Sequence, residues 1–386
     1  MSTLTVLNVV PDERFGGPQN RILRVAEQLK EKDIKTIVVM PQGDDTYTKM
    51  LRKSHIPFYQ LRTFRRLPNP SNIVGVTFWF IYFIPCIIVL IRIMRRHNVD
   101  IVHVNGGLNV QVSLAAKISR KKLLWHLNDV RKLGVIKPFL LLLLRLLPDK
   151  VVGASSAVER CYFDSNATGK MDILYPPVDT SKFYPSDLHV KEYREEFGIN
   201  SDERVVGIVG NMNPFKGYEY FLPAADFIRK RLPKVKFLIV GKRLETHEAY
   251  WQRITALIDN LKLKGDIVMT SHRTDIHRIM NVMDVFVLSS IYEAAPIVVL
   301  EAMACARPIV ATRVGGVPEL VVEEETGVLI PPREPEAIAK AVLGILDNLE
   351  RSKQMGENAR RRVIDNFDIT ICADRHEEIY KQLLLS

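Results

Sequence analysis

Short apolar runs of three to seven residues recur along this chain, each followed by a segment with helical spacing. Such an alternation is typical of parallel sheets that are covered by helices on both faces. The predicted strands of the first half are Leu4–Val10, Thr36–Pro41, Ile56–Leu61, Asp100–Asn105, Lys122–His126 and Lys150–Ala154. Those of the second half are Arg204–Val209, Val235–Val240, Ile267–Met269, Val285–Leu288, Pro308–Thr312 and Val328–Ile330.

A segment with three prolines, Tyr175–Ser186, interrupts the alternation. Proline fixes its backbone angle and has no N–H to donate, so a cluster of prolines favours a hinge. A length of 386 residues also agrees with two domains. We therefore predict an α/β fold with two Rossmann-like parallel-sheet domains that face a cleft. The first domain covers residues 1–184 and the second covers residues 185–368.

Cysteine usage and the first residues bear on the compartment. The chain has four widely scattered cysteines, with no CxxC pair and no Cys/His cluster. This pattern favours a reducing compartment and argues against zinc or an iron–sulfur cluster. The opening MSTLTVLNVV is too short and uncharged for a signal peptide and is predicted to be a strand. We expect a cytoplasmic protein with no bound metal.

Charge is distributed unevenly between the two halves. Residues 1–184 carry a net charge of +13, whereas the remainder carries −3. The first half is therefore expected to meet an anionic surface. Membrane phospholipid and lipid-linked phosphate both fit. Nucleic acid fits less well, because no basic run is interleaved with aromatic residues and no helix-turn-helix signature is present.

One segment of the first half is long enough to cross a membrane. Residues 74–91 run for 18 residues without a charge and are followed by Arg92, Arg95 and Arg96. A true span would place the first three strands and the next three on opposite sides of the bilayer, and the sheet could not form. We favour a helix at the rim of the first domain that dips into a membrane surface. A helix buried in the protein is the alternative.

Several residues that could bind a ligand directly follow predicted strands. In open parallel sheets, ligands bind beyond the carboxyl ends of the strands. An ordinary structural reading stays open for each residue, since a glycine pair makes a turn and a lone histidine is often structural. The residues at such strand ends are Gly16 and Gly17, His126, Asn211 and Glu293.

The segment after Val285–Leu288 presents two carboxylates. Glu293 lies in a loop, Pro296 opens an apolar helix, and Glu301 is about one turn further in. Free amides in the first turn of a helix attract phosphate, and a carboxylate can accept hydrogen bonds from a ribose diol. The two carboxylates therefore indicate two contacts on one elongated ligand.

The block GNMNPFKG, residues 210–217, follows another predicted strand and leads into a helix. It matches neither GxxxxGK[ST] nor GxGxxG, so it is not a recognised phosphate loop. Lys216 places one cation at the start of a helix, where it suits a diphosphate. A solvated surface lysine is the alternative.

Taken together, these residues resemble the retaining family-four glycosyltransferases, which have the two-domain GT-B fold. The resemblance spans nearly the whole chain. It is strongest in SSIYEAAPIVVLEAMACARPIVATRVGGVPELV with the following TGVLIPP, and next strongest in GNMNPFKGYEYFLPAA. The segments FGGPQN, DIVHVNGG and LLWHLND match more loosely. In that fold the trailing helix, residues 369–386, crosses back to the first domain.

The resemblance implies a nucleotide-sugar donor that is held mainly by the second domain. Lys216 would neutralise the diphosphate, Glu301 would bind the ribose hydroxyls and Glu293 would hold the transferred sugar. The family usually has an arginine five residues before the lysine, and Asn211 leaves that charge unmatched. The sugar would also meet backbone amides beside Pro296, which itself has no N–H. The residues of that amide group are Ala294, Ala295, Pro296 and Ile297.

The resemblance also implies donor contacts from the first domain. His126 would contact the sugar or the donor phosphate, and Gly16 and Gly17 would line the donor phosphate near the acceptor. We assign catalytic roles to His126 and Glu293. No cofactor is expected, because the nucleotide-sugar is a co-substrate and Lys216 with the helix dipoles would supply the charge that a metal provides elsewhere.

The expected acceptor is a lipid-linked saccharide or another membrane-associated glycan precursor at the inner face of the cell membrane. The basic first half and its apolar segments motivate this expectation. Two other readings stay open. One is an epimerase or phosphorylase with the same fold, and the other is a nucleotide-sugar-binding protein that has lost activity, which Asn211 favours.

Overall fold

The computed structural model describes residues 3–12, 16–43, 45–64, 72–106, 108–130, 137–163, 171–271 and 273–386. Phe15 and Gly107, which belong to two of the motifs quoted above, lie outside these ranges. The chain divides into two compact units, one made of Met1–Pro176 with Ile369–Ser386 and the other of Pro177–Asp368. Residues 177–184, which we assigned to the first domain, pack with the second unit, where Arg360 donates a hydrogen bond to the Phe183 carbonyl at 3.1 Å.

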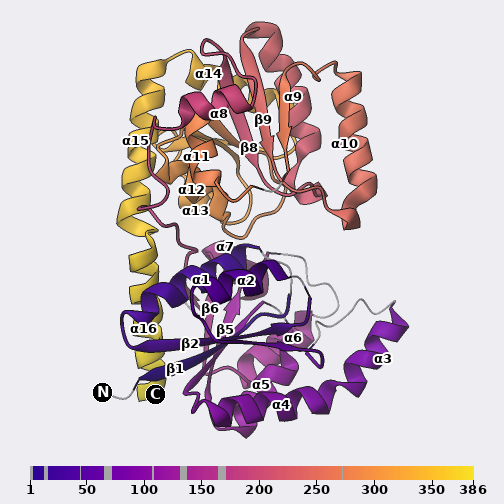
Figure 1. Cartoon of the computed structure of the whole chain (residues 1–386), viewed down its shortest axis with the longest axis vertical. Coiled ribbons are helices and arrows are strands. Elements are labelled where there is room, and N and C mark those ends of the chain that lie inside the picture. The colour runs from indigo at the N-terminus through magenta and orange to yellow at the C-terminus, as the bar shows by residue number, and fades with distance from the viewer. Residues whose placement is uncertain are drawn as a thin grey trace. The chain divides into compact units, whose positions relative to one another are not determined.

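The first unit is built on a parallel sheet of order β3-β2-β1-β4-β5-β6-β7 (Figure 1). The register pairs Val6 of β1 with Thr36 on one side and with Ile101 on the other. The strand order therefore reverses between β1 and β4, which is the topological switch point of the sheet. The strands are β1 (Leu4–Val9), β2 (Ile34–Pro41), β3 (Phe58–Leu61), β4 (Ile101–Asn105), β5 (Lys122–Leu127), β6 (Lys150–Gly153) and β7 (Asp172–Ile173).

Helices follow the strands of this unit, and one more comes from the end of the chain. The C-terminal helix α16 contributes Ile369, Ala373 and Tyr380 to an apolar core that also contains residues of β1, β4 and β5. The prediction that the last helix packs on the first domain is thereby confirmed. The helices are α1 (Gly17–Lys30), α2 (Asp45–Lys53), α3 (Ile73–Ile81), α4 (Phe83–Arg96), α5 (Val110–Ile118), α6 (Lys137–Leu146), α7 (Ser156–Phe163) and α16 (Ile369–Leu385).

The second unit has a parallel sheet of order β10-β9-β8-β11-β12-β13, so its switch point lies between β8 and β11. The strands are β8 (Arg204–Val209), β9 (Val235–Val240), β10 (Ile267–Thr270), β11 (Val285–Leu288), β12 (Ile309–Thr312) and β13 (Gly327–Ile330). The α-helices are α8 (Val190–Glu196), α9 (Tyr218–Arg231), α10 (Glu248–Asn260), α11 (Ile276–Ile279), α12 (Ile297–Ala304), α13 (Val317–Leu320), α14 (Pro335–Leu346) and α15 (Leu349–Asn366). Short 3₁₀ turns are η2 (Pro214–Lys216), η3 (Glu245–His247) and η4 (Met280–Val282).

The prediction of two Rossmann-like parallel-sheet domains is confirmed, and every predicted strand forms. The two-residue strand β7 was not predicted, because two residues carry no readable pattern. Alternating apolar runs identified the other strands because helices cover the sheets and leave inner strands such as β1, β2 and β11 almost wholly buried.

The apolar segment 74–91 forms two helices rather than one. Helices α3 and α4 meet at Tyr82 with a bend of 46°. In the described ranges no single helix has the length and apolarity to cross a membrane, although the bent pair does when its two halves are taken together. The inner face of α4 is buried, whereas α3 buries none of its side chains. The reading of one helix packed inside the protein is therefore wrong for α3.

Candidate functional site

The carboxyl ends of β8 and β11 meet at the switch point of the second unit, and each is followed by a charged residue. Lys216 comes from the segment after β8, and Glu293 from the segment after β11. The Lys216 Nζ atom lies 2.6 Å from Glu293 Oε1, although the two residues are 77 positions apart in the chain. The structure thus joins two of the predicted site residues in one ion pair.

This ion pair is half-shielded from water. The side chains of Lys216 and Glu293 are 23% and 14% exposed, and Ser290 Oγ donates a second hydrogen bond to Glu293 Oε1 at 2.8 Å. A lysine whose partner is a carboxylate can exchange that carboxylate for another anion without becoming an unpaired charge. The pair is therefore suited to open when an anionic ligand arrives.

Two glycines let the loops around the ion pair approach closely. Gly217 has φ +67, and a Cβ there would lie 2.1 Å from the Ser289 carbonyl oxygen. Gly315 has φ +49, and a Cβ there would lie 1.6 Å from the carbonyl oxygen of Glu293. Any side chain at either position would push the loops apart, so both glycines set the place of the Lys216–Glu293 pair.

Helix α12 begins one residue later than predicted. Pro296 is its N-cap, with φ −76 and ψ 113, rather than its first helical residue. The amide of Ile297 therefore opens the first turn, where N–H groups have no partner within the helix. Glu301 lies four residues further, or about 6 Å along the helix axis. Four members of this segment are half-buried, namely Ala294, Ala295, Ile297 and Glu301.

Asn211 is exposed and is engaged with the backbone. Its Oδ1 atom accepts a hydrogen bond from the Lys242 amide at 3.2 Å, and its carbonyl accepts one from the Asn213 side chain at 3.2 Å. These contacts hold the turn after β8 against the turn after β9. Asn211 thus has a local structural role in the structure, and because its side chain is neutral it adds no positive charge there.

Gly16 and Gly17 are both exposed at the start of α1. Gly16 is the N-cap, with an extended backbone that any residue can adopt. A Cβ on Gly16 would meet only Gln19 Oε1, at 3.5 Å, which is an ordinary contact. Within the described structure, the steric need for glycine that is evident at Gly217 and Gly315 is not present at Gly16.

His126 is fully buried at the end of β5. The Arg21 Nη1 atom lies 2.6 Å from His126 Nε2. A guanidinium has only donors, so Nε2 must accept, and the neutral ring must carry its proton on Nδ1. That Nδ1 lies 3.3 Å from His103 Nε2, which must then accept in turn. The hydrogen-bond network thus assigns one tautomer to each ring.

The chain of hydrogen bonds continues to the C-terminal helix. His103 Nδ1 lies 2.7 Å from Tyr380 Oη, and one turn earlier in α16 His376 Nδ1 lies 2.7 Å from the Cys372 carbonyl. Burial, with a smaller contribution from neighbouring positive charges, holds the pKa of His126 and of His103 well below the ordinary histidine value. Burial likewise lowers the pKa of His376 to about 3. These rings are therefore neutral at physiological pH.

Arg21 is the centre of this network and was missed by our sequence analysis. Its guanidinium also donates to Asn128 Oδ1 at 2.8 Å and to Asn105 Oδ1. Burial lowers the pKa of Arg21 to about 10, so the side chain stays charged at neutral pH. In the described structure all its hydrogen-bond acceptors are neutral. One signal was available, since Arg21 lies four residues before Val25, on the buried stripe of α1.

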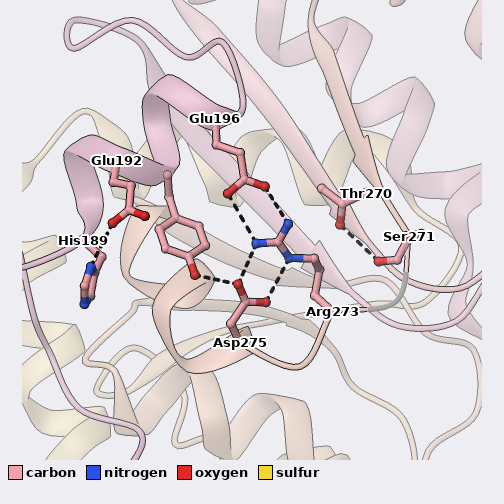
Figure 2. Close-up of polar contacts among 8 residues, drawn as sticks. His189, Glu192, Glu196, Thr270, Ser271, Arg273 and Asp275 are labelled. Atoms are coloured by element: carbon pink, nitrogen blue, oxygen red, sulfur yellow. Dashed lines mark hydrogen bonds and ion pairs between the residues drawn. The ribbon is translucent and has the colours of Figure 1, made fainter.

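Arg273, in the loop after β10, is held by acidic side chains (Figure 2). Its guanidinium donates to Glu196 Oε1 at 2.6 Å and to Asp275 Oδ2 at 2.6 Å. It also lies over the Tyr193 ring at 5.7 Å from the centroid. Hydrogen bonding to Arg273 lowers the pKa of Asp275 to about 2. Arg273 therefore clamps α8 to the loop after β10.

No group of three or more His, Cys, Asp or Glu residues with the geometry to hold a metal ion occurs among the described residues. All four cysteines are free thiols. Burial raises the pKa of Cys86, Cys305 and Cys372 to about 12. These three thiols are therefore protonated and poor nucleophiles at neutral pH.

The fold and the paired charges at the second switch point describe a GT-B glycosyltransferase. Two family models match the chain in succession: Glycosyltransferase Family 4 over residues 15–182 and Glycosyl transferases group 1 over residues 189–362. Together these matches account for most of the sequence. The chain belongs to the family-four glycosyltransferases.

Individual relatives agree with this assignment. N-acetyl-alpha-D-glucosaminyl L-malate synthase of Bacillus anthracis is 25% identical over 76% of this chain and 77% of its own length. A galactosyltransferase of Escherichia coli, UDP-Gal:alpha-D-GlcNAc-diphosphoundecaprenol alpha-1,3-galactosyltransferase, is 26% identical over 56% of this chain and 55% of its own length. The crystal structure of a glycosyltransferase from Rickettsia africae superimposes with a TM-score of 0.85 at 25% identity, covering 100% of this chain and 99% of that one.

Proposed function

We propose that this enzyme transfers a sugar from a nucleotide-sugar to a membrane-associated acceptor, and that the second unit holds the donor. The observation that carries the proposal is the Lys216–Glu293 ion pair at the switch point between β8 and β11. A nucleotide-sugar brings a diphosphate, which can take the place of Glu293 as the partner of Lys216. The E. coli relative is named for a UDP-sugar donor, which supports this class of substrate.

The proposed roles follow the order of the groups along the segment after β11. The diphosphate lies between Lys216 and the amide of Ile297 at the start of α12. Glu301, about one turn further into the helix, accepts hydrogen bonds from the ribose hydroxyls. Glu293 leaves Lys216 and binds hydroxyls of the transferred sugar. Each of these groups is half-buried, which strengthens its electrostatic interaction relative to one in bulk water.

In the proposed reaction, the bond between the anomeric carbon and the donor phosphate oxygen breaks. The bonding electrons leave with the nucleoside diphosphate, and Lys216 and the α12 amides stabilise the added negative charge. An acceptor hydroxyl forms the new bond to the anomeric carbon, and its proton passes to the departing phosphate oxygen. Proton transfer on the side of the leaving group corresponds to attack from the same face, with retention of configuration.

The proposed acceptor is a lipid-linked saccharide or another glycan precursor at the cytoplasmic face of the cell membrane. The name of the E. coli relative specifies an acceptor linked to diphosphoundecaprenol, and the first half of this chain carries a charge of +13. The name of the Bacillus relative includes malate, a small carboxylate. Product analysis with both classes of acceptor distinguishes them, since only a lipid-linked product partitions into organic solvent.

A pair of substitutions tests the donor assignment. Lys216→Ala and Glu301→Ala are expected to abolish transfer while the fold is kept, because both side chains are half-buried and lie outside the apolar cores. Lys236→Ala is the matched control, since Lys236 forms a similarly shielded pair with Glu203 at the amino ends of the strands. Wild-type turnover by either site variant, with the control equally active, would sink the assignment.

Assays of the wild-type protein decide between the proposed function and its rivals. A thermal-shift panel of UDP-, GDP- and ADP-sugars first identifies the donor. Binding without turnover across soluble and lipid-linked acceptors supports an inactive nucleotide-sugar-binding protein, for which Asn211 is the motivating residue. Conversion of the donor without an acceptor supports an epimerase, and release of a sugar phosphate supports a phosphorylase. Transfer that persists in EDTA supports a mechanism without a metal.

A further inference from the structure

Helix α3 has no polar face and no buried side chain. Ile73, Val74, Phe80 and Ile81 are 77%, 66%, 65% and 59% exposed, and Figure 1 shows the helix at the outer end of α4, away from the sheet of the first unit. A surface helix in water usually presents a polar face to the solvent. The composition of α3 is instead that of a helix surrounded by apolar material.

Two polar side chains at α3 form hydrogen bonds within the helix itself. Asn72 caps its start by accepting a hydrogen bond from the Gly75 amide at 2.9 Å. The Thr77 hydroxyl donates to the Ile73 carbonyl at 2.9 Å. Hydrocarbon offers no hydrogen bonds, so a polar group in a lipid environment must find its partner within the protein. The internal pairing of Thr77 thus agrees with a lipid environment.

The outward face of α4 continues the apolar surface and then becomes cationic. Ile84 and Ile88 are 59% and 43% exposed, and Arg92 follows on the same face, about 12 Å from Ile84 along the helix. Arg95 and Arg96 are also exposed, and none of the three arginines forms an ion pair with a described residue. This order matches the passage from acyl chains to phosphate groups at a bilayer surface.

The charge of the surrounding sequence decides between a bilayer and a second copy of the chain. Residues 46–99 contain nine Lys and Arg and no Asp or Glu. Two copies that met through this segment would bring like charges together. An anionic phospholipid surface offers the complementary charge and the apolar interior at once.

We propose that α3 and the outward face of α4 insert into the boundary between the headgroups and the acyl chains of an anionic bilayer. This inference rests on the proposed function at the membrane, and it specifies how the protein attaches to the bilayer. The attachment is mainly apolar, so it persists at high salt, and the arginines add a preference for anionic lipid.

Trp79 in α3 makes the proposal testable in the full-length protein. Of the other tryptophans, Trp125 is fully buried in the first unit and Trp251 lies in the second. Vesicles of phosphatidylcholine and phosphatidylglycerol, with bromine on the acyl chains of the phosphatidylcholine, are expected to quench Trp79 at both low and high salt. Trp79→Phe removes the quenched emission, and Trp251→Phe keeps it.

Two sets of variants separate the apolar and the ionic contributions. The double variant Phe80→Ser with Ile81→Ser is expected to weaken vesicle binding about tenfold or more, since both side chains are exposed and their loss leaves the core intact. The triple variant Arg92→Gln, Arg95→Gln and Arg96→Gln is expected to weaken binding to anionic vesicles about tenfold or more and to leave binding to pure phosphatidylcholine unchanged.

Three outcomes would overturn the insertion proposal. They are failure to sediment with vesicles, sedimentation without quenching of Trp79, and dimerisation through α3 in the absence of lipid. Binding of nucleoside diphosphate, measured by calorimetry in the serine variant, reports on the donor site separately. In the wild-type protein, absence of vesicle binding with intact nucleotide binding refutes insertion alone, whereas vesicle binding without any nucleotide response refutes the donor assignment alone.

Discussion

Each unit of this protein holds a cation at the switch point of its sheet, and the two cations are held in opposite ways. Lys216 in the second unit is partly exposed and pairs with the carboxylate of Glu293. Arg21 in the first unit is 3% exposed and donates to the neutral side chains of Asn105, His126 and Asn128. A cation that pairs with a carboxylate can exchange it for a ligand. A buried cation surrounded by neutral acceptors is locked into the fold.

Under the proposed function, the difference separates a residue that binds the substrate from a residue that positions others. Opening the Lys216 pair releases one carboxylate and one ammonium, and a diphosphate with a sugar can satisfy both. Moving Arg21 would leave two buried acceptors, Asn105 and His126, and the half-buried Asn128 without this donor, and each unsatisfied buried group costs about 1–3 kcal/mol. The comparison therefore predicts that changes at Lys216 affect catalysis and that changes at Arg21 affect stability.

The largest expected effect is the loss of transfer on replacing Lys216. Lys216→Met should lower kcat by about 10²–10³-fold, because one charge that stabilises the leaving group is removed. Its free energy of unfolding should change by less than about 1 kcal/mol, as is usual for a half-exposed ion pair. Steady-state kinetics and urea unfolding measure the two quantities. Lys236→Met is the control, and a large loss of stability in Lys216→Met would contradict the comparison.

Acid should unfold the first unit before the second. The pKa values of His103, His126 and His376 are lowered by burial in the folded state. Histidines with a lowered pKa contribute stability above the unfolded value of about 6.5, and this stability is lost as the pH falls below it. The loss approaches about 1.4 kcal/mol per pH unit for each ring at lower pH. Between pH 6.5 and 5.5, where the unfolded rings go from half to mostly protonated, it is about 1 kcal/mol for each ring and about 3 kcal/mol for the three.

The ion pairs of the second unit respond at a lower pH. Asp275 has its pKa lowered to about 2 through its hydrogen bonds with Arg273, so its contribution is complete above about pH 4 and is lost toward pH 2. Hydrogen exchange, corrected for intrinsic rates, should show the peptides of β4 and β5 losing protection near pH 5.5 while those of β8 and β11 stay protected. Simultaneous loss of protection in both units below pH 4.5 would argue against this assignment.

Replacing Arg21 should have the next largest effect, this time on stability. Arg21→Met is expected to lower the free energy of unfolding by about 3 kcal/mol, because Asn105, His126 and Asn128 lose their donor while the cost of a buried charge is removed. Arg24→Met, one turn further along α1 in a partly exposed pair with Glu27, should cost less than about 1 kcal/mol. Urea unfolding compares them, and equal stabilities would show that Arg21 is not locked into the fold.

The tautomers of the histidines give a second measurement of the same network. Nitrogen chemical shifts in protein labelled with ¹⁵N-histidine should show His126 protonated at Nδ1 and unprotonated at Nε2. The reason is that Arg21 donates a hydrogen bond to Nε2. In Arg21→Met this constraint is lifted and the pKa of His126 should rise, because one nearby positive charge is gone. A His126 that is protonated at Nε2 in the wild-type protein would contradict the network.

The fold and the grouping of residues after β8 and β11 were easier to predict from the sequence than the first-unit network, for physical reasons. Buried parallel strands appear in the sequence as apolar runs. In the segment after β11, Glu293, Pro296 and Glu301 lie within nine residues, so their spacing along the chain is enough to predict that they lie close together. The Arg21 network joins α1, β4, β5 and α16, and its hydrogen-bonded partners are up to 277 positions apart. No local pattern can show such contacts, although the position of Arg21 on the buried stripe of α1 was an available signal for one member.

The bend between α3 and α4 and the N-cap position of Pro296 were also beyond the sequence pattern. Both depend on where a helix meets its neighbours rather than on the order of apolar residues. The hydropathy of residues 74–91 is uniform, yet α4 packs on the unit and α3 leaves it. The close approach of Gly315 to Glu293 is likewise a contact between loops that follow different strands. Glycine permits this contact, but a glycine in the sequence does not predict which loop it will meet.

The smallest effect we predict is a gain rather than a loss. Glu293→Gln keeps the shape of the side chain and removes the charge that compensates Lys216, so a nucleoside diphosphate no longer competes with a carboxylate. The affinity of the Glu293→Gln variant for the nucleoside diphosphate should rise about tenfold, equivalent to about 1.4 kcal/mol. Sugar transfer should fall, because the Glu293 carboxylate is no longer available to hold the sugar. Calorimetry with the identified nucleotide measures affinity, and the gain should shrink as salt is added.

Glu203→Gln is the matched control for this gain, because the Lys236–Glu203 pair has similar exposure, 19% and 12%, at the amino ends of the same strands. Its nucleotide affinity should equal that of the wild type. A tighter complex in Glu293→Gln alone means that the ligand must displace Glu293 before Lys216 can bind it. An equal loss of affinity and turnover in Glu293→Gln would mean instead that Glu293 only positions Lys216, and the exchangeable cation of the second unit would then be as fixed as Arg21.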